Sequence, residues 1–114
     1  WSKGRATLLG DACHATLPFL AQGAVMSIED GVVLGRCLDK YDDPQEALRR
    51  YEQARVERPS RMVRGAKDNT ARFHEAALAT EEGAVKYMES EWSRAPIQDR
   101  YEWLYSYDAE TVDI

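Results

Sequence analysis

The sequence has few cysteines, no excess of positive charge and no long apolar run. The two cysteines, Cys13 and Cys37, form neither a disulfide framework nor a zinc-binding spacing, which indicates a reducing, cytoplasmic setting. No apolar run could cross a bilayer and no basic and apolar leader pattern is present, so we expect no membrane association. Lys and Arg number 15 against 20 Asp and Glu, so the 114-residue chain lacks the basic surface that nucleic acids require.

The first residues predict one short strand. Apolar residues run from Arg5 to Leu9 before Gly10 and Asp11, which is typical of a buried strand that enters a turn. Nothing later resembles a second strand, and a strand without neighbours leaves its backbone groups unpaired. The chain also begins with Trp1 and not with Met. We therefore expect it to be the C-terminal part of a longer protein whose sheet is encoded upstream.

The remainder predicts a mainly α chain, with that one strand and about four helices. Asp43 is a good N-cap, Pro44 suits the first helical position, and Glu46 stands three residues after the cap. Arg58 precedes Pro59 and is biased away from helical dihedrals, so a helix should end near Glu57 and another should begin at Pro59. We expect a loop over residues 11–22 and helices over residues 22–37, 44–57, 59–80 and 82–92, with a short helix restarting at Pro96.

Several faces of these helices have a predicted role. Ser27, Gly31 and Gly35 form a small-residue stripe that allows close backbone approach, and a separate apolar face of the same helix carries Val25, Ile28, Val32 and Leu38. Helical periodicity predicts that Val85, Met88 and Trp92 are buried. The basic residues Arg55, Arg58, Arg61, Arg64 and Lys67 recur every three positions, so we expect them to wind around the helix as a solvated, salt-bridged surface.

The segment from Leu9 to Asp30 carries the chemistry. An aspartate, Asp11, follows the predicted strand, and Gly23 opens a helix whose free amides point back toward it. Asp11 would accept hydrogen bonds from hydroxyl groups, while the Gly23 and Ala24 amides would hold a developing anion, which suits a polyhydroxylated, partly anionic ligand. The alternative is that Asp11 only caps a turn or a helix.

This segment resembles the C-terminal flavin-binding motif of single-component FAD-dependent aromatic hydroxylases, closest to the salicylate hydroxylase and 6-hydroxynicotinate 3-monooxygenase branch. That motif reads Gly-Asp-Ala-Ala-His, then a proline, then Gly-Gln-Gly and a helix that contains Glu-Asp. The matching residues here are Gly10-Asp11-Ala12-Cys13-His14, Pro18, Gln22-Gly23-Ala24 and Glu29-Asp30.

The resemblance implies an α/β FAD-binding fold in the parent protein, with residues 1–40 as the C-terminal strand, loop and helix of that domain and residues 41–114 as a helical tail. Asp11 would accept hydrogen bonds from the ribityl chain, Pro18 would line the isoalloxazine ring, and the Gly23 and Ala24 amides would approach its N1 and C2 carbonyl edge. The residues expected to bind FAD are Asp11, Pro18, Gln22, Gly23, Ala24 and Val25. The parent would hydroxylate an aromatic or heteroaromatic acid with NAD(P)H and O2. Without the upstream region, apolar surface on the helix over residues 22–37 and on the strand would be uncovered, so we expect the chain to self-associate as a homo-oligomer.

Other readings stay open at this point. The chain has no GxGxxG fingerprint for the ADP half of FAD, so alone we expect it to be inactive and to bind FAD weakly. A helical self-association module without a cofactor, or part of a related reductase or halogenase, is the alternative. We expect no metal site and no catalytic side chain, with His14 as a structural residue, His74 at the surface, Cys13 and Cys37 as inert thiols, and Glu29 and Asp30 complementing a helix dipole.

Overall fold

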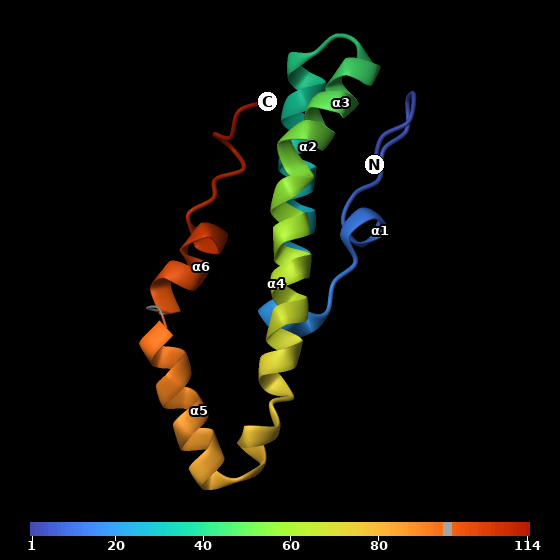
Figure 1. Ribbon diagram of the computed structural model, residues 1–114. Coiled ribbons are helices and arrows are strands. Elements are labelled where there is room, and N and C mark those ends of the chain that lie inside the picture. Colours follow the sequence, from blue (N-terminus) through green and yellow to red (C-terminus); the bar gives the residue numbers. More distant parts are fainter. Residues whose placement is uncertain (95–96) are drawn as a thin grey trace. The chain divides into compact units, whose positions relative to one another are not determined.

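The computed structural model describes residues 1–94 and 97–114, and it is mainly helical, as predicted. The elements in order are α1 (Asp11–His14), the 3-10 helix η1 (Pro18–Leu20), α2 (Gly23–Lys40), α3 (Pro44–Arg55), α4 (Glu57–Phe73), the 3-10 helix η2 (Ala76–Ala79), α5 (Glu81–Arg94) and α6 (Ile97–Tyr105) (Figure 1). Two compact units result, one made of Trp1–Asn69 with Asp108–Ile114 and the other of Thr70–Tyr107. Within the described ranges, no helix is both long and apolar enough to cross a membrane.

The N-terminal segment makes a tight turn at Gly4 and Arg5 and forms no strand, so the strand predicted from Arg5 to Leu9 is wrong for this chain. Lys3 and Ala6 make an isolated antiparallel bridge, and the Leu8 amide donates to the Trp1 carbonyl at 3.2 Å. The Tyr51 hydroxyl of α3 donates to the Leu8 carbonyl at 3.2 Å. Among the described residues, no other segment forms a strand that could pair with residues 5–9 in a sheet.

The loop predicted over residues 11–22 contains two short helical turns. The Cys13 and His14 amides both donate to the Gly10 carbonyl at 3.0 Å, which closes the single turn of α1. Pro18 opens η1, which ends at Ala21 in a left-handed conformation with φ of 53°. Residues 11–22 are therefore not a loop throughout, because these two short helical turns interrupt it.

The helix starts follow local signals closely. Asp43 caps α3, since its Oδ1 accepts from the Gln45 amide at 3.1 Å, and Pro44 is the first helical residue, as predicted. The helix boundary expected before Pro59 is present but lies slightly earlier, because α3 ends at Arg55 and α4 begins at Glu57, with Val56 between them. Pro59 lies in the first turn of α4, where its missing N–H is not needed for a helical hydrogen bond.

The second half is divided differently from the prediction. The helix expected to continue to Thr80 ends at Phe73, and residues 76–79 form η2 before α5 begins at Glu81. A following helix is present as α6, but Pro96, its predicted start, lies outside the described residues. Glu91 of α5 accepts from Arg100 of α6 at 3.0 Å and pairs with Arg72 of α4 at 3.5 Å, which ties this unit together.

The core of the first unit lies between α2 and α3. Its fully buried members are Val33 and Cys37 of α2 and Ala47 and Tyr51 of α3. The C-terminal segment returns to this core, where Ala109, Val112 and Ile114 pack. Arg36 Nη1 of α2 donates to the Ala109 carbonyl at 2.8 Å, so the last residues are held by polar contacts as well as apolar ones.

Two apolar faces are left open to solvent. On α2, Val25, Ile28 and Leu38 are 39%, 68% and 51% exposed. On α5, the predicted burial of Val85, Met88 and Trp92 is wrong, since they are exposed. Periodicity identifies the apolar face of a helix, but a partner that covers that face must be supplied by another segment.

Candidate functional site

The predicted ligand-binding residues gather around one open pocket of about 410 Å³. It lies where the Asp11 turn, η1 and the beginning of α2 meet. Five of the six predicted residues line it, and only Val25 does not. The lining residues are Asp11, Thr16, Pro18, Ala21, Gln22, Gly23, Ala24 and Ser27.

Gly10 places the Asp11 turn directly against α2. Its backbone has φ of 62° and ψ of −139°, a combination that residues with a Cβ rarely adopt. A Cβ at this position would stand 2.7 Å from Ser27 Oγ. Ser27 Oγ in turn donates to the Gly23 carbonyl at 3.1 Å. The backbone before Asp11 therefore contacts the first turns of α2 at a distance that only glycine allows.

The beginning of α2 offers free hydrogen-bond donors to the pocket. Its N-cap, Gln22, makes no side-chain cap, and the Met26 amide is the first to bond back, to the Gln22 carbonyl at 2.9 Å. The Gly23 and Ala24 amides precede that bond at the positive end of the helix dipole. Asp11 is exposed and lines the same pocket. The pocket lining thus includes both a carboxylate acceptor and backbone donors.

A buried carboxylate, Asp30, joins the Asp11 turn to the helices. It is fully buried, and its Oδ2 accepts from the Gly10 amide at 3.1 Å and lies 2.6 Å from His14 Nε2. Its Oδ1 accepts from Nε of Arg55 at 2.7 Å, and Arg55 is also fully buried. Asp30 is therefore bound from α1 and from α3 at once.

The neighbouring carboxylate, Glu29, continues the network toward α4. It accepts a bidentate pair of hydrogen bonds from Arg58, both at 2.7 Å, and lies 2.9 Å from Nη1 of Arg55. The expectation that Glu29 and Asp30 only complement a helix dipole is therefore wrong. The expectation of a solvated arginine run is also wrong for Arg55 and Arg58, although Arg64 pairs with Glu57 at the surface as expected.

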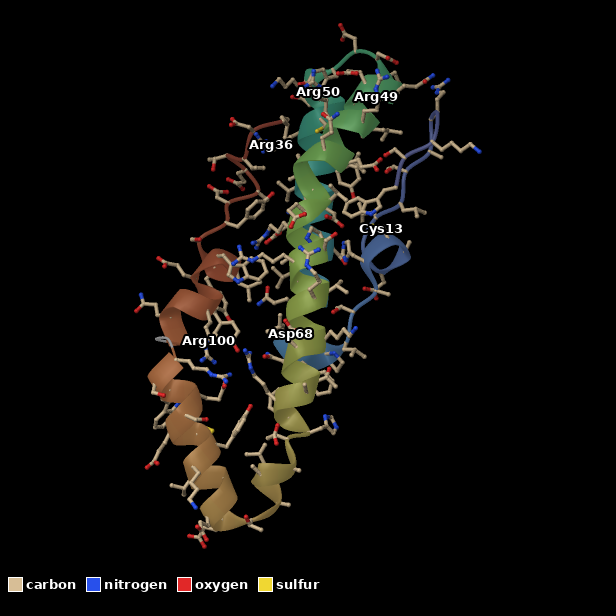
Figure 2. All side chains as sticks on the ribbon, viewed as in Figure 1. Cys13, Arg36, Arg49, Arg50, Asp68 and Arg100 are labelled. Carbon is tan, nitrogen blue, oxygen red and sulfur yellow. The ribbon has the colours of Figure 1, made fainter. Side chains whose placement is uncertain are left out.

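His14 has the structural role that the sequence predicts. It is buried, it is held by Asp30, and its ring lies 5.8 Å from the Trp1 ring. Cys13 donates from Sγ to the Gly10 carbonyl at 3.3 Å (Cys13 is labelled in Figure 2). Burial raises the pKa of Cys13 and of Cys37, which keeps both thiols protonated at neutral pH.

Cys13, His14 and Asp30 bring three potential metal ligands within 4.8 Å of one another. Both oxygens of Asp30 already bind donors, and one of those donors is the Arg55 cation. A metal ion there would meet a positive charge on the same carboxylate, so the donor set does not favour one.

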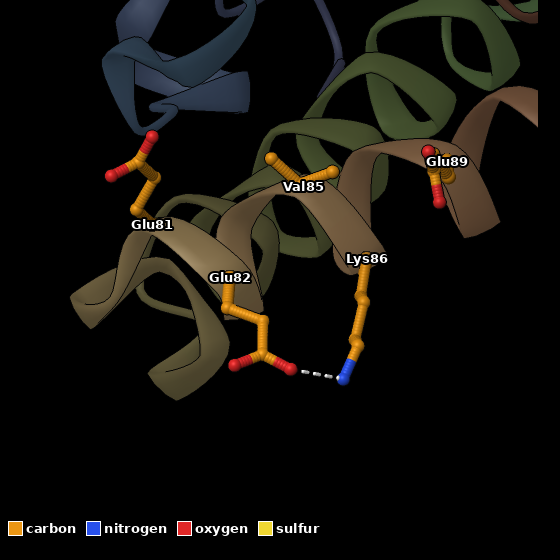
Figure 3. Close-up of a pocket in the computed structure, with 5 residues that line it drawn as sticks. All are labelled: Glu81, Glu82, Val85, Lys86 and Glu89. Carbon is orange, nitrogen blue, oxygen red and sulfur yellow. Dashed lines mark hydrogen bonds and ion pairs between the residues drawn. The ribbon is translucent and has the colours of Figure 1, made fainter.

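A second open pocket, of about 620 Å³, lies on α5 (Figure 3). Its lining residues are Glu81, Glu82, Val85, Lys86 and Glu89, with Lys86 and Glu82 paired at 2.6 Å. All five come from successive turns of one helix, so the hollow lacks groups that converge on a ligand from different elements.

Comparison with known proteins identifies the family of this chain. Residues 1–66, more than half of the chain, match the family described as FAD binding domain. The chain belongs to this FAD-binding family. The match includes the whole pocket and the Asp30 network.

Relatives of this chain carry the names of aromatic hydroxylases. A 3-amino-4-hydroxybenzoate 2-monooxygenase from Streptomyces platensis is 38% identical over 113 residues, which cover 98% of this chain and 28% of that protein. A 6-hydroxynicotinate 3-monooxygenase from Pseudomonas fluorescens is 50% identical over 72 residues, covering 61% of this chain and 19% of that protein. A 3-hydroxybenzoate 6-hydroxylase from Polaromonas naphthalenivorans is 37% identical over 113 residues, covering 95% and 27%. The chain therefore spans less than a third of each of these relatives.

The residues that sequence reasoning missed are the two buried arginines. Arg55 and Arg58 stand three positions apart, and Glu29 and Asp30 are adjacent on an earlier helix. Two acids next to each other on a helix with an apolar core face could have signalled a matching pair of cations. That signal is weak, because exposed acidic and basic residues of this chain are also adjacent or three positions apart.

Proposed function

We propose that this chain is the flavin-binding C-terminal part of an FAD-dependent monooxygenase that hydroxylates an aromatic or heteroaromatic acid with NAD(P)H and O2. The observation that carries the proposal is the pocket that gathers Asp11, Pro18, Gln22, Gly23 and Ala24 inside the family match. The substrate class is supported by the names of the relatives, which refer to a hydroxybenzoate, an aminohydroxybenzoate and a hydroxynicotinate.

The pocket fits FAD in its chemistry. The exposed Asp11 carboxylate suits the hydroxyl groups of the ribityl chain, and the uncapped Gly23 and Ala24 amides suit the edge of the ring that gathers negative charge on reduction. Pro18 supplies a rigid wall, and Val25 would contribute only its backbone, since its side chain does not line the pocket. When bound, FAD supplies the oxidative chemistry, and these residues bind and orient it.

The rest of the longer polypeptide is the partner that we propose for this chain. Residues 1–40 would complete the FAD-binding domain and residues 41–114 would form a helical tail. Because the chain spans less than a third of the relatives above, the upstream region would hold most of the substrate and NAD(P)H contacts. The free thiols of Cys13 and Cys37 favour a reducing compartment, which we take to be the cytoplasm.

A second candidate, self-association of the chain, is favoured by the open face of α2. Val25, Ile28 and Leu38 expose an apolar surface that a second copy would cover in the absence of the upstream region. Light scattering at increasing concentration tests this candidate, and a monomer at every concentration would exclude it. The same face would be covered by the upstream region in the longer polypeptide, where any homo-oligomer would use another surface.

Replacing Asp11 tests the flavin site. In the longer polypeptide, Asp11→Ala removes hydrogen bonds to a charged acceptor, which contribute about 1.5 to 3 kcal/mol. We expect the dissociation constant for FAD, measured by quenching of flavin fluorescence, to rise roughly 10- to 100-fold. The control is Asp42→Ala, an exposed aspartate in the turn before α3, which should leave the constant unchanged. An unchanged affinity in the Asp11 variant would contradict the proposed site.

A further inference from the structure

We propose that Arg55 is a positioning residue for FAD, acting through Asp30 on the turn that carries Asp11. Because Asp11 binds FAD only if the proposed function is right, this role of Arg55 depends on that function. Arg55 lies at the end of α3 and does not line the pocket. Its effect must therefore pass through the groups it contacts.

The contacts of Asp30 bracket Asp11. Its carboxylate accepts from the Gly10 amide, one residue before Asp11, and binds His14, the last residue of α1. Both ends of the turn are thus attached to one side chain. Asp30 belongs to α2, the helix whose first amides line the pocket. One helix therefore carries the Gly23 and Ala24 donors and also the carboxylate that holds the Asp11 turn beside the same pocket.

Arg55 provides the charge that makes this attachment possible. A buried carboxylate is costly unless it is paired and hydrogen-bonded. Nε of Arg55 donates to Asp30 at 2.7 Å, and Nη2 donates to the Met26 carbonyl at 3.3 Å, which fixes the plane of the guanidinium. Glu29, the other acid at this junction, is matched by Arg58. The two acids and two arginines therefore balance without a charge on His14.

His14 contacts Asp30 through one ring nitrogen. Nε2 lies 2.6 Å from Asp30 Oδ2, whereas Nδ1 is buried and has no hydrogen-bond partner among the described residues. Arg55 carries a permanent positive charge, so it is the cation that compensates Asp30.

Loss of Arg55 leaves the buried Asp30 carboxylate without its cation. Arg58 is bound to Glu29 by two hydrogen bonds and does not replace it. In Arg55→Met, the attachment of the Asp11 turn to Asp30 should therefore weaken.

The experiment measures the dissociation constant for FAD in the longer polypeptide by flavin fluorescence. We expect Arg55→Met to weaken binding about tenfold relative to wild type. Arg55→Lys keeps the charge without the planar fork, so it should recover part of the loss. The matched control is Arg49→Met. Arg49, which is labelled in Figure 2, lies on the same helix but is exposed and pairs with Glu46.

A double variant tests whether Arg55 acts through Asp11. If it does, Arg55→Met should change FAD affinity far less in an Asp11→Ala background than in the wild type. Equal effects in both backgrounds, or an Arg55→Met variant with wild-type affinity, would overturn the positioning role. An Asp11→Ala variant with wild-type affinity would instead overturn the proposed function. If Arg55→Met does not fold, Asp30→Asn and Arg55→Lys give the same readout, and wild-type FAD affinity in both would refute the role.

Discussion

Gly10 is the residue at which a single methyl group should most disturb the candidate site. It brings the backbone before Asp11 onto α2 with φ of 62° and ψ of −139°. A Cβ there would lie 2.7 Å from Ser27 Oγ and 3.2 Å from Ser27 Cβ. Gly10→Ala should therefore both strain the backbone and push α1 away from α2.

The expected loss of stability has two parts. Holding a residue with a Cβ in this sparsely populated region costs about 1 to 3 kcal/mol. Moving Ser27 Oγ aside sacrifices its hydrogen bond to the Gly23 carbonyl, which contributes about 0.5 to 1.5 kcal/mol. We expect the free energy of unfolding to fall by roughly 2 to 4 kcal/mol.

Urea unfolding followed by circular dichroism measures this loss in the 114-residue chain. The matched control is Gly31→Ala, because Gly31 lies on α2 with nothing within 4 Å of its Cβ position. That control should stabilise the chain by up to about 1 kcal/mol. Combining Gly10→Ala with Ser27→Gly should remove the steric part of the loss and leave the backbone part.

The steric reasoning would be refuted if Gly10→Ala unfolded within about 0.5 kcal/mol of the wild type. It would also be refuted if Ser27→Gly failed to reduce the effect of Gly10→Ala. A loss of equal size in Gly31→Ala would show that α2 tolerates no methyl group anywhere, and would remove the special position of Gly10.

Two further predictions concern the helix ends and the second unit. Asp43→Ala removes the cap on the Gln45 amide and should lower the free energy of unfolding by about 1 kcal/mol, whereas Asp42→Ala should change it by less than about 0.5 kcal/mol in the same urea titration. Hydrogen bonding from Arg100 holds the pKa of Glu91 below its ordinary value of 4.5, so this contribution to stability is complete above that pH and is lost as the pH falls through the folded-state pKa. Unfolding of wild type and Arg100→Gln between about pH 6 and about pH 3 should therefore show a shallower acid dependence in the variant, and parallel curves would contradict this.

Local signals explain which elements could be predicted. The start of α3 was predicted to the residue because Asp43 and Pro44 act within one turn of chain. The helix boundary before Pro59 was predicted about two residues too late, since α3 ends at Arg55 and α4 begins at Glu57. A proline is tolerated anywhere in the first helical turn, so it does not fix the residue at which the helix begins. Helix ends near residue 73 and the 3-10 turn that follows lack a comparable signal.

Burial was harder to predict than helicity. Val85, Met88 and Trp92 share the periodicity of a core face yet are exposed, whereas Arg55 belongs to a polar run and is fully buried. Periodicity reports which side chains share a face, but the charge partners of Arg55 lie on another helix, about 25 residues earlier in the chain.

The amino-acid sequence by itself determined the helical character of this protein and the cap of α3, because each depends on neighbours within a few positions. The resemblance of residues 9–30 to a known motif predicted five residues that line the candidate flavin pocket. Only the tertiary structure decided that Asp30 and Arg55 hold the Asp11 turn against α2. A buried ion pair requires two side chains from distant segments to leave water together, and no local pattern encodes that meeting.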